Sequence, residues 1–297
     1  MIEVKNISKK YGEQVAINNI SFSIKQGEIV GFLGPNGAGK STVMKMINSY
    51  ISSDEGVIKI AGLDISKNAI DTKKKIGYLP ENNPLYTEMY VREYLEYVAG
   101  LYNVSFSEID NIIGVTGLDE EANKNISQLS KGYKQRVGLA AAIIHNPEYL
   151  ILDEPTTGLD PNQIIEIRDL IKSFGKQKTI LLSTHILQEV EAMCDRVIII
   201  NKGNLVLDKK ISDFSQDSND KCTVVFDKEI EQSIIEAELG VEILENSFKK
   251  IYSFVLNKDG AYKRIAEFSA KHNVNIIEFK VSKKSLEDIF AEVTINN

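Results

Sequence analysis

Residues 34–42, GPNGAGKST, combine glycines, a lysine and a hydroxyl side chain at a spacing that suits phosphate binding. Gly34 and Gly39 bracket four spacer residues, and glycines let the chain curve so that successive N–H groups face one anion. Lys40 would meet the β and γ phosphates as a positive charge, and Ser41 would offer its hydroxyl to Mg²⁺. The segment therefore predicts a P-loop for a nucleoside triphosphate, whose remaining members are Pro35, Asn36, Gly37, Ala38 and Thr42.

A pair of carboxylates follows an apolar run further along the chain. In YLILDEP, residues 149–155, Asp153 and Glu154 end a predicted strand, so we expect their side chains to point to opposite sides of it. Asp153 would hold Mg²⁺ through water, and Glu154 would orient and deprotonate an attacking water. Taken alone, the first motif could be a glycine-rich turn without a ligand, and two acidic residues after an apolar run more often mark an ordinary strand end. Together, the motifs favour a magnesium-dependent nucleotide hydrolase.

Alternating strand and helix patterns would position these motifs. Short β-branched runs come first and predict an antiparallel β-rich edge, at residues 2–7, 21–24, 28–33 and 57–60. Further strands are predicted at residues 76–79, 149–154, 179–184 and 196–200. Helical patterns separate them, after Lys40, over residues 91–117, and from Ser130, Pro161 and Ile186. This alternation predicts an α/β fold with a parallel sheet and helical crossovers.

The composition of the chain changes after Leu207. Residues 212–221 are polar and turn-rich, as in a linker. Strand patterns follow at residues 223–226, 251–256 and 275–281, and helical patterns at 229–239, 261–271 and 285–293. We therefore expect a nucleotide-binding domain over residues 1–211, with a helical subdomain at about 84–147, and a small α+β accessory domain over residues 222–297.

Charge and composition exclude several classes of partner. The chain carries 35 Lys and Arg against 42 Asp and Glu, a formal net charge of -7, so it has no general attraction to nucleic acid. Cys194 and Cys222 form no CxxC pair, which suits a reducing cytoplasm. No signal-like stretch opens the chain, and no window approaches about 18 consecutive apolar residues. We expect a cytoplasmic chain that does not itself cross a membrane.

Four further motifs resemble those of one family. LSKGYKQR, from Leu129 to Arg136, resembles the ABC signature LSGGQ, and the segment 158–160, GLD, resembles the D-loop. The segment 183–185, STH, resembles the H-loop, and Tyr11 resembles the aromatic residue that stacks on adenine. Residues 1 to about 210 thus resemble one complete P-loop ABC ATPase cassette. With PEN after IGYL and a closing KKSLEDIFAEVT, the chain is similar to ATP-binding subunits of ABC-2-type exporters, and in particular to the gliding-motility-associated ABC ATP-binding subunit.

The resemblance implies a site shared between two chains. Two cassettes would close head to tail around ATP and Mg²⁺ as an ATP-dependent homodimer. Ser130 and Gly132 of one chain would face the γ phosphate on the other, Asp160 would join the ATP-binding set, and His185 would contact the γ phosphate as a switch. Other readings stay open, because Ser130 also suits a helix cap and Tyr11 also suits packing at a strand end.

The chain departs from the family pattern at three positions. The usual Q-loop glutamine aligns with Glu81, so a carboxylate replaces an amide oxygen near Mg²⁺. The first signature glycine is Lys131 and the terminal glutamine is Tyr133. Neither change removes the contacts expected of Ser130 and Gly132.

Three functions follow as hypotheses. The first is the ATPase subunit of a membrane transporter, peripheral on the inner face of the membrane, which drives separate transmembrane permease subunits docked on residues 81–128. The second is a soluble ABC ATPase acting on the ribosome or DNA, and the single cassette, the absence of coiled-coil heptads and the acidic tail count against it. The third is a cassette that binds ATP without turnover, and the intact residues Lys40, Asp153, Glu154 and His185 count against that.

Overall fold

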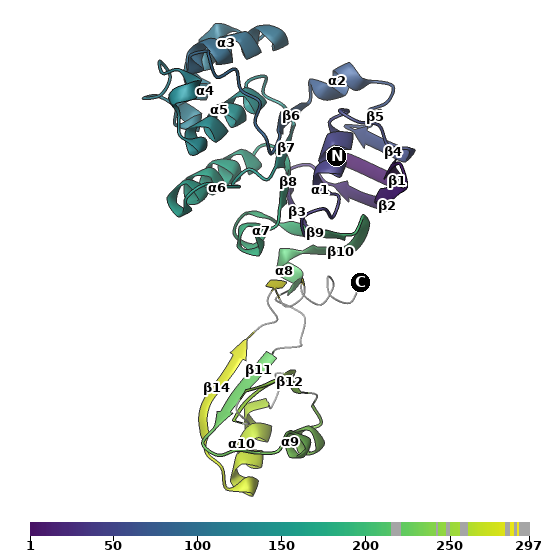
Figure 1. Ribbon diagram of the computed structural model, residues 1–297, viewed down its shortest axis with the longest axis vertical. Helices are drawn as coiled ribbons and strands as arrows, with labels where there is room; N and C mark the ends of the chain where they lie inside the picture. The colour runs from purple at the N-terminus through teal and green to yellow at the C-terminus, as the bar shows by residue number, and fades with distance from the viewer. Residues whose placement is uncertain are drawn as a thin grey trace. The chain divides into compact units, whose positions relative to one another are not determined.

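The computed structural model describes residues 1–214, 221–241, 243–247, 250–255, 261–282, 286–287 and 290. The chain divides into two compact units, Met1–Ile211 and Ser212–Asn296 (Figure 1). Each unit has its own sheet or sheets and its own core.

A six-stranded sheet, in the order β10-β9-β3-β8-β7-β6, is the centre of the first unit. Its strands are β3 (Ile29–Leu33), β6 (Ile76–Leu79), β7 (Tyr149–Asp153), β8 (Thr179–Thr184), β9 (Arg196–Asn201) and β10 (Asn204–Lys210). The strands from β9 to β6 run parallel, and β10 pairs antiparallel with β9. Every residue of β3, β7 and β8 is buried, because helices or a second sheet cover both faces of a parallel sheet.

A smaller antiparallel sheet, in the order β2-β1-β4-β5, packs beside the central one (Figure 1). Its strands are β1 (Ile2–Tyr11), β2 (Gln14–Ile24), β4 (Glu55–Ile60) and β5 (Leu63–Asp64). Apolar residues of β1 and β2 share one core with helix α1 (Lys40–Ile47) and with β3, β7, β8 and β9. This core fixes the start of α1, and therefore the loop before it, against the edge of both sheets.

Helices connect the parallel strands. They are α2 (Ala69–Lys73), α3 (Val91–Tyr102), α4 (Ile109–Thr116), α5 (Lys131–Ile143), α6 (Pro161–Gly175) and α7 (Leu187–Met193), with short 3₁₀ turns at Phe106–Glu108 and Ile126–Gln128. A short helix, α8 (Ile211–Phe214), follows β10. α3, α4 and α5 pack around a separate cluster of buried residues. In α3 the buried positions Val91, Leu95, Val98 and Ala99 recur at helical spacing and face that cluster, whereas Tyr97 and Leu101 are exposed.

The second unit has a βαββαβ order. Its elements are β11 (Lys221–Phe226), α9 (Gln232–Leu239), β12 (Ile243–Ser247), β13 (Ile251–Val255), α10 (Ala261–His272) and β14 (Ile276–Ser282). The strands form an antiparallel sheet in the order β12-β13-β11-β14, which is the ferredoxin-like arrangement. Alternate residues of β11, Cys222, Val224 and Phe226, join residues of both helices in one core.

Three expectations from the sequence need correction or fall partly outside the described residues. Residues 28–33 do not belong to the antiparallel edge, since β3 lies between β9 and β8 in the parallel sheet and is buried on both faces. The expected linker of residues 212–221 is shorter, because α8 extends to Phe214 and β11 begins at Lys221. Residues 215–220 lie outside the described residues, as does the expected helix at 285–293 apart from 286–287 and 290.

Candidate active site

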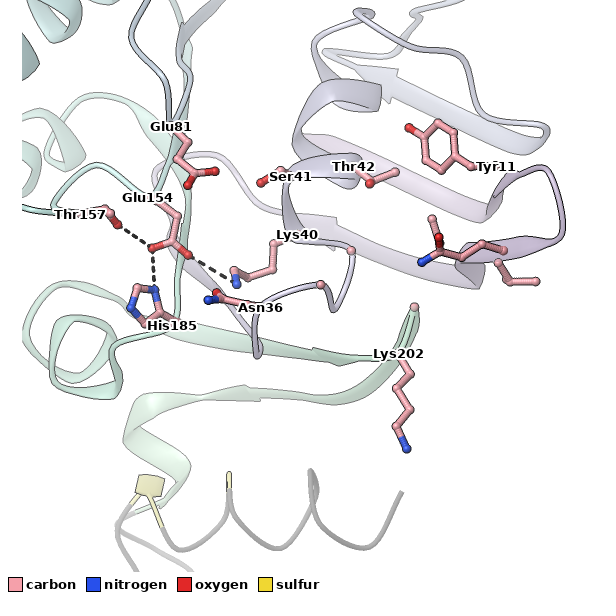
Figure 2. A pocket seen from close by; sticks show the side chains of 16 residues that line it. Tyr11, Asn36, Lys40, Ser41, Thr42, Glu81, Glu154, Thr157, His185 and Lys202 are labelled. Atoms are coloured by element: carbon pink, nitrogen blue, oxygen red, sulfur yellow. Dashed lines mark hydrogen bonds and ion pairs between the residues drawn. The ribbon is translucent and has the colours of Figure 1, made fainter.

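The loops that follow β3, β7 and β8 meet at one edge of the parallel sheet. The P-loop follows β3, Glu154 follows β7, and His185 follows β8. Because the carboxyl ends of parallel strands meet at one edge, this edge is where ligand sites form in open α/β sheets. A cavity of about 700 Å³ opens there, lined by residues of all three loops together with Tyr11 and Glu81 (Figure 2).

Close packing explains two of the P-loop glycines. A Cβ atom on Gly34 would lie 2.4 Å from the backbone oxygen of Ile200 in β9. Gly39 has φ 110°, and its Cβ would lie 2.6 Å from Ile17 Cδ1. No other residue fits either position without moving the backbone. The Gly203 N–H also donates to Ala38 O (3.0 Å), so the β9–β10 hairpin holds the loop from outside.

Lys40 is held inside the loop that precedes it. Its side chain is 6% exposed, and Nζ donates to Gly34 O (2.8 Å) and Pro35 O (3.3 Å). Nζ also lies 3.4 Å from Glu154 Oε1, whose side chain is 8% exposed. A cation is therefore fixed at the centre of the cavity wall, with acceptors that anionic phosphates can replace.

Glu154 lies just beyond the end of the strand that the sequence predicts over residues 149–154. β7 ends at Asp153, and Glu154 adopts φ 50°, so the expected alternation of the two side chains along one strand is wrong. Its N–H donates to Ser183 Oγ (2.9 Å), and its Oε2 accepts from Thr157 Oγ1 (3.1 Å). A left-handed conformation in a residue other than glycine costs energy, and these bonds support it.

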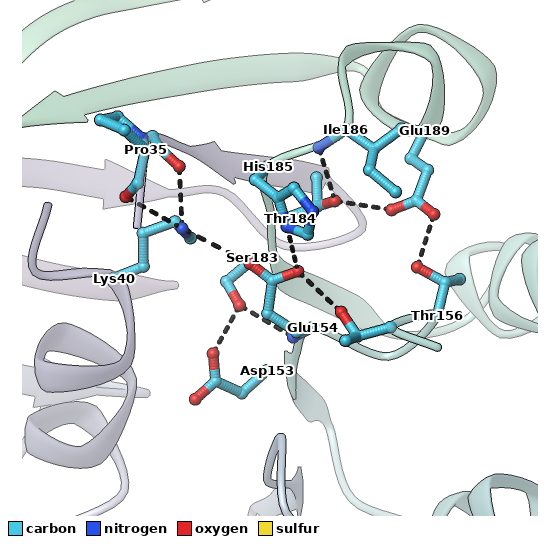
Figure 3. Close-up of polar contacts among 12 residues, drawn as sticks. Pro35, Lys40, Asp153, Glu154, Thr156, Ser183, Thr184, His185, Ile186 and Glu189 are labelled. Atoms are coloured by element: carbon cyan, nitrogen blue, oxygen red, sulfur yellow. Dashed lines mark hydrogen bonds and ion pairs between the residues drawn. The ribbon is translucent and has the colours of Figure 1, made fainter. Parts of the chain in front are cut away.

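His185 completes a hydrogen-bonded group with Glu154. Nδ1 lies 2.9 Å from Glu154 Oε2, and the imidazole side chain is 45% exposed. Because an ionised carboxylate only accepts, Nδ1 carries the proton in this pair. Lys40, Glu154 and His185 thus form one chain of polar contacts on the cavity wall (Figures 2 and 3).

Side-chain oxygen atoms of Asp153, Ser41 and Glu81 lie near the group of Lys40, Glu154 and His185. Asp153 is 1% exposed, and its Oδ1 accepts from Ser183 Oγ (2.6 Å) and from Ser41 Oγ (3.2 Å). Burial and the Asp153 carboxylate raise the pKa of Tyr78 in β6, so that phenol stays protonated. Glu81 reaches into the same cavity from the segment after β6.

This oxygen set fits Mg²⁺. Mg²⁺ prefers hard oxygen ligands and keeps several waters and substrate phosphates, so it needs only one or two protein groups. Among the residues that the structure describes, no cluster of three or more His, Cys, Asp or Glu side chains could hold a metal alone. Ser41 and Asp153 therefore suit an ion that is completed by phosphates and water.

Tyr11 lies at the opposite end of the cavity from Glu154 (Figure 2). The residue ends β1 and is 50% exposed, so its ring is not simply packed at a strand end. Sequence motifs did not identify five further lining residues of the cavity, which are Gln14, Val15, Ala16, Lys202 and Gly203. They come from β2 and the β9–β10 turn, and only the fold brings these hairpins to the P-loop. Thr157 was also missed, although its place in the turn after Glu154 was a usable signal.

The predicted signature and D-loop residues do not line this cavity in their own chain. The predicted residues Gly34, Pro35, Ala38 and Asp153 are also absent from its lining, although each adjoins in sequence a residue that lines it or another P-loop residue. Ser130 is exposed and caps α5, accepting from Tyr133 N (3.4 Å). Gly132 packs against α6, where a Cβ would be 2.6 Å from Gln163 Cδ, so a larger residue would displace the end of the Gln163 side chain. Asp160 caps α6, accepting from the N–H groups of Asn162 (3.1 Å) and Gln163 (3.0 Å). Each residue therefore has a structural role within the described cassette.

Fold and site together define a P-loop ATPase cassette. The family model described as "ABC transporter" matches residues 17–157. "Uncharacterized ABC transporter ATP-binding protein YhcH" of Bacillus subtilis (strain 168) is 34% identical over 99% of this chain and 96% of its own length. "Bacitracin transport ATP-binding protein BcrA" of Bacillus licheniformis is 32% identical over 99% and 97%. The chain belongs to the ABC transporter family.

Solved structures support the same assignment. The "Dimeric structure of a post-hydrolysis state of the ATP-binding cassette MJ0796 bound to ADP and Pi" matches with a TM-score of 0.65 at 28% identity, covering 71% of this chain and 99% of that one. The chain is an ABC ATPase of the kind that serves as ATP-binding subunit of a transporter. None of the helices in the described residues is both long and apolar enough to cross a bilayer.

Proposed function

We propose that the cavity binds Mg-ATP between the P-loop and Tyr11 and hydrolyses it with Glu154 as general base. The observation that carries the proposal is the group of Lys40, Glu154 and His185, joined at 3.4 and 2.9 Å on one wall. The backbone N–H groups of residues 34–42 and the start of α1 receive the phosphates, and the exposed ring of Tyr11 stacks on adenine.

Each side chain of the group has a separate task. The phosphates displace Gly34 O and Pro35 O from Lys40, which then neutralises charge on the β and γ phosphates. Glu154 accepts a proton from water while the water oxygen attacks the γ phosphorus, and ADP leaves with the electron pair of the broken P–O bond. His185 donates to the carboxylate and fixes its direction.

Mg²⁺ is the metal that this donor set implies. Ser41, Asp153 and Glu81 would hold it, directly or through water. When bound, Mg²⁺ neutralises phosphate charge that the protein's cations leave unbalanced. Glu81 supplies a carboxylate oxygen where the family has an amide oxygen. The position therefore still offers Mg²⁺ an oxygen ligand, and it adds one negative charge.

A second copy of the chain completes the site in this proposal. Ser130, Gly132 and Asp160 lie at the N-terminal ends of α5 and α6, which carry partial positive charge, yet they do not line their own chain's cavity. A head-to-tail homodimer would bring these ends to the γ phosphate on the partner chain. The similar MJ0796 cassette was solved as a dimer with ADP and Pi bound, which supports this arrangement.

Transmembrane permease subunits would dock on a second cavity. Its volume is about 340 Å³, and its lining includes Tyr50, Tyr78, Tyr94, Leu101 and Tyr102. Tyr50 is 68% exposed and Leu101 63% exposed, so apolar surface faces outward there. Asn83, two residues after Glu81, also lines it, so a partner seated there contacts the segment that reaches the nucleotide cavity.

Only the names of the relatives mention a transported compound. BcrA is named for bacitracin transport, and a B. subtilis relative, 31% identical over 99% of this chain, for linearmycin resistance. We therefore propose an exporter subunit on the inner face of the membrane. The gliding-motility assignment stays a prediction from the sequence, because these relatives carry other names. A ribosome- or DNA-directed ATPase is not favoured by relatives named for transport or by the net charge of -7.

Membrane association tests the proposal. Leu101→Glu places a charge on the docking cavity, and Ile165→Glu, at a residue 54% exposed on α6, is the matched control. We expect both variants to keep the ATPase activity of the purified chain, and only Leu101→Glu to leave the membrane fraction. Parental chain that sediments with ribosomes or DNA and not with membranes would overturn the transporter role.

A further inference from the structure

A fully buried carboxylate is hydrogen-bonded to the two loops that carry Glu154 and His185. Glu189 in α7 is 0% exposed. Its Oε1 accepts from Thr156 Oγ1 (2.5 Å) and its Oε2 accepts from Thr184 Oγ1 (2.6 Å). Arg168 of α6 lies 3.7 Å from Oε1. A buried charge is costly unless it is paired and hydrogen-bonded, and here both oxygens and the charge are matched.

The two threonines belong to the two catalytic loops. Thr156 follows Glu154 in the turn after β7, and Thr184 directly precedes His185 at the end of β8 (Figure 3). The ladder between β7 and β8 ends with the pair Asp153 and Ser183. Beyond that pair, the Glu189 carboxylate joins the two loops, and Figure 3 shows it on the other side of Glu154 and His185 from Lys40.

We propose that Glu189 is a positioning residue that fixes the distance between Glu154 and His185. One rigid carboxylate takes one hydroxyl from each loop, so it sets how far apart the loops stand. The Glu154–His185 hydrogen bond of 2.9 Å depends on that separation. The inference rests on the proposed function, because it assigns Glu189 a role only through Glu154 and His185.

The geometry demands both the charge and the length of Glu189. A glutamine has one acceptor oxygen and one donor NH₂ group, so one threonine hydroxyl loses its acceptor. An aspartate is shorter by one methylene and cannot reach both hydroxyls. Thr184 Oγ1 also accepts from Ile186 N (3.1 Å), so a change at Glu189 reaches the backbone beside His185.

A purely structural role would look different in kinetics. If Glu189 only anchored α7, its loss would lower stability and act by the same factor whether or not His185 is present. A positioning role predicts a loss in kcat without a loss in KM for ATP, because the P-loop and Tyr11 do not contact Glu189. It also predicts that the loss shrinks once the ring being positioned is gone.

The test is steady-state phosphate release by the full chain with Mg-ATP. Glu189→Gln should lower kcat about 10- to 100-fold, the size expected when a catalytic group is displaced by about 1 Å, with KM within about twofold. Glu191→Gln, an exposed glutamate on the same helix, is the matched control and should keep the parental kcat. In a His185→Ala background, Glu189→Gln should change kcat by less than about threefold.

Parental kcat in Glu189→Gln, or an equal factor in both backgrounds, would overturn the inference. Glu154→Gln is measured in the same assay. If Glu154→Gln is inactive while Glu189→Gln has the parental kcat, only the role of Glu189 is refuted. If Glu154→Gln is fully active, the proposed function is refuted. If Glu189→Gln does not fold, the kcat values of Thr156→Val and Thr156→Ser test the role of Glu189 instead. Valine should lower kcat about 10-fold and serine, which keeps the hydroxyl, should not; equal rates would refute the role.

Discussion

Replacing Glu154 by glutamine separates the binding of ATP from its hydrolysis. The substitution keeps the size of a side chain that is 8% exposed and removes its charge. Glutamine cannot take a proton from water, so kcat should fall on the order of 10² to 10⁴. The P-loop is untouched, so ATP should still bind.

The structure also sets the direction of the change in affinity. Glu154 Oε1 lies 3.4 Å from Lys40 Nζ, and the carboxylate repels the phosphates that approach the same lysine. Removing one negative charge beside several others should tighten ATP binding by on the order of 1 kcal/mol, about fivefold. Lys40 keeps Gly34 O and Pro35 O as acceptors, so the unfolding free energy should fall by only about 1 kcal/mol, less than for a buried pair without other partners.

Phosphate release, equilibrium ATP binding and thermal unfolding measure the three effects on the same protein. Glu191→Gln, which removes an exposed charge, is the control for all three. Parental turnover in Glu154→Gln would refute its role as general base. Weaker ATP binding would refute the electrostatic reasoning and leave the catalytic role intact.

Three further changes test other parts of the site. Lys40→Ala should weaken ATP binding at least tenfold, because it removes the cation that meets the phosphates, and unchanged affinity would contradict the P-loop assignment. Glu81→Ala should raise the Mg²⁺ concentration needed for half-maximal turnover severalfold while Glu81→Gln stays near parental; identical Mg²⁺ titrations would show that Glu81 is not at the metal. Deleting residues 212–297 should leave a folded unit that binds ATP, because the first unit contains every nucleotide motif and its own core. If the truncated protein is insoluble even when the boundary is moved by several residues in either direction, the two units share one core.

The fold class was predictable because periodicity and motifs agreed. Short apolar runs such as YLIL, residues 149–152, indicate buried parallel strands, and five strands of the central sheet run parallel. The run at residues 28–33 was placed in the wrong sheet, because a short apolar strand carries no information on its partners. β10 and β12, NLVLDKK and ILENS, were missed, because their polar residues hide the strand pattern.

The sequence singles out the P-loop, Asp153, Glu154 and His185 because short local motifs contain them, and the structure brings Lys40, Glu154 and His185 together at one cavity. Lys202 and Gly203 were not predictable, because only the packing of the β9–β10 turn brings them to the cavity. Glu189 gave no signal either, since a glutamate in an amphipathic helix reads as a surface residue until its burial is known.

The central claim is that each ATP is closed between two chains, and the mass of the ATP-bound protein tests it most directly. Glu154→Gln retains ATP, so light scattering in Mg-ATP should show a dimer that reverts to monomer without nucleotide. Adding Ser130→Arg, which places a bulky side chain at the exposed cap of α5, should leave a monomer that still binds ATP. A Glu154→Gln, Ser130→Arg protein that dimerises with ATP as readily as Glu154→Gln alone would contradict the shared site.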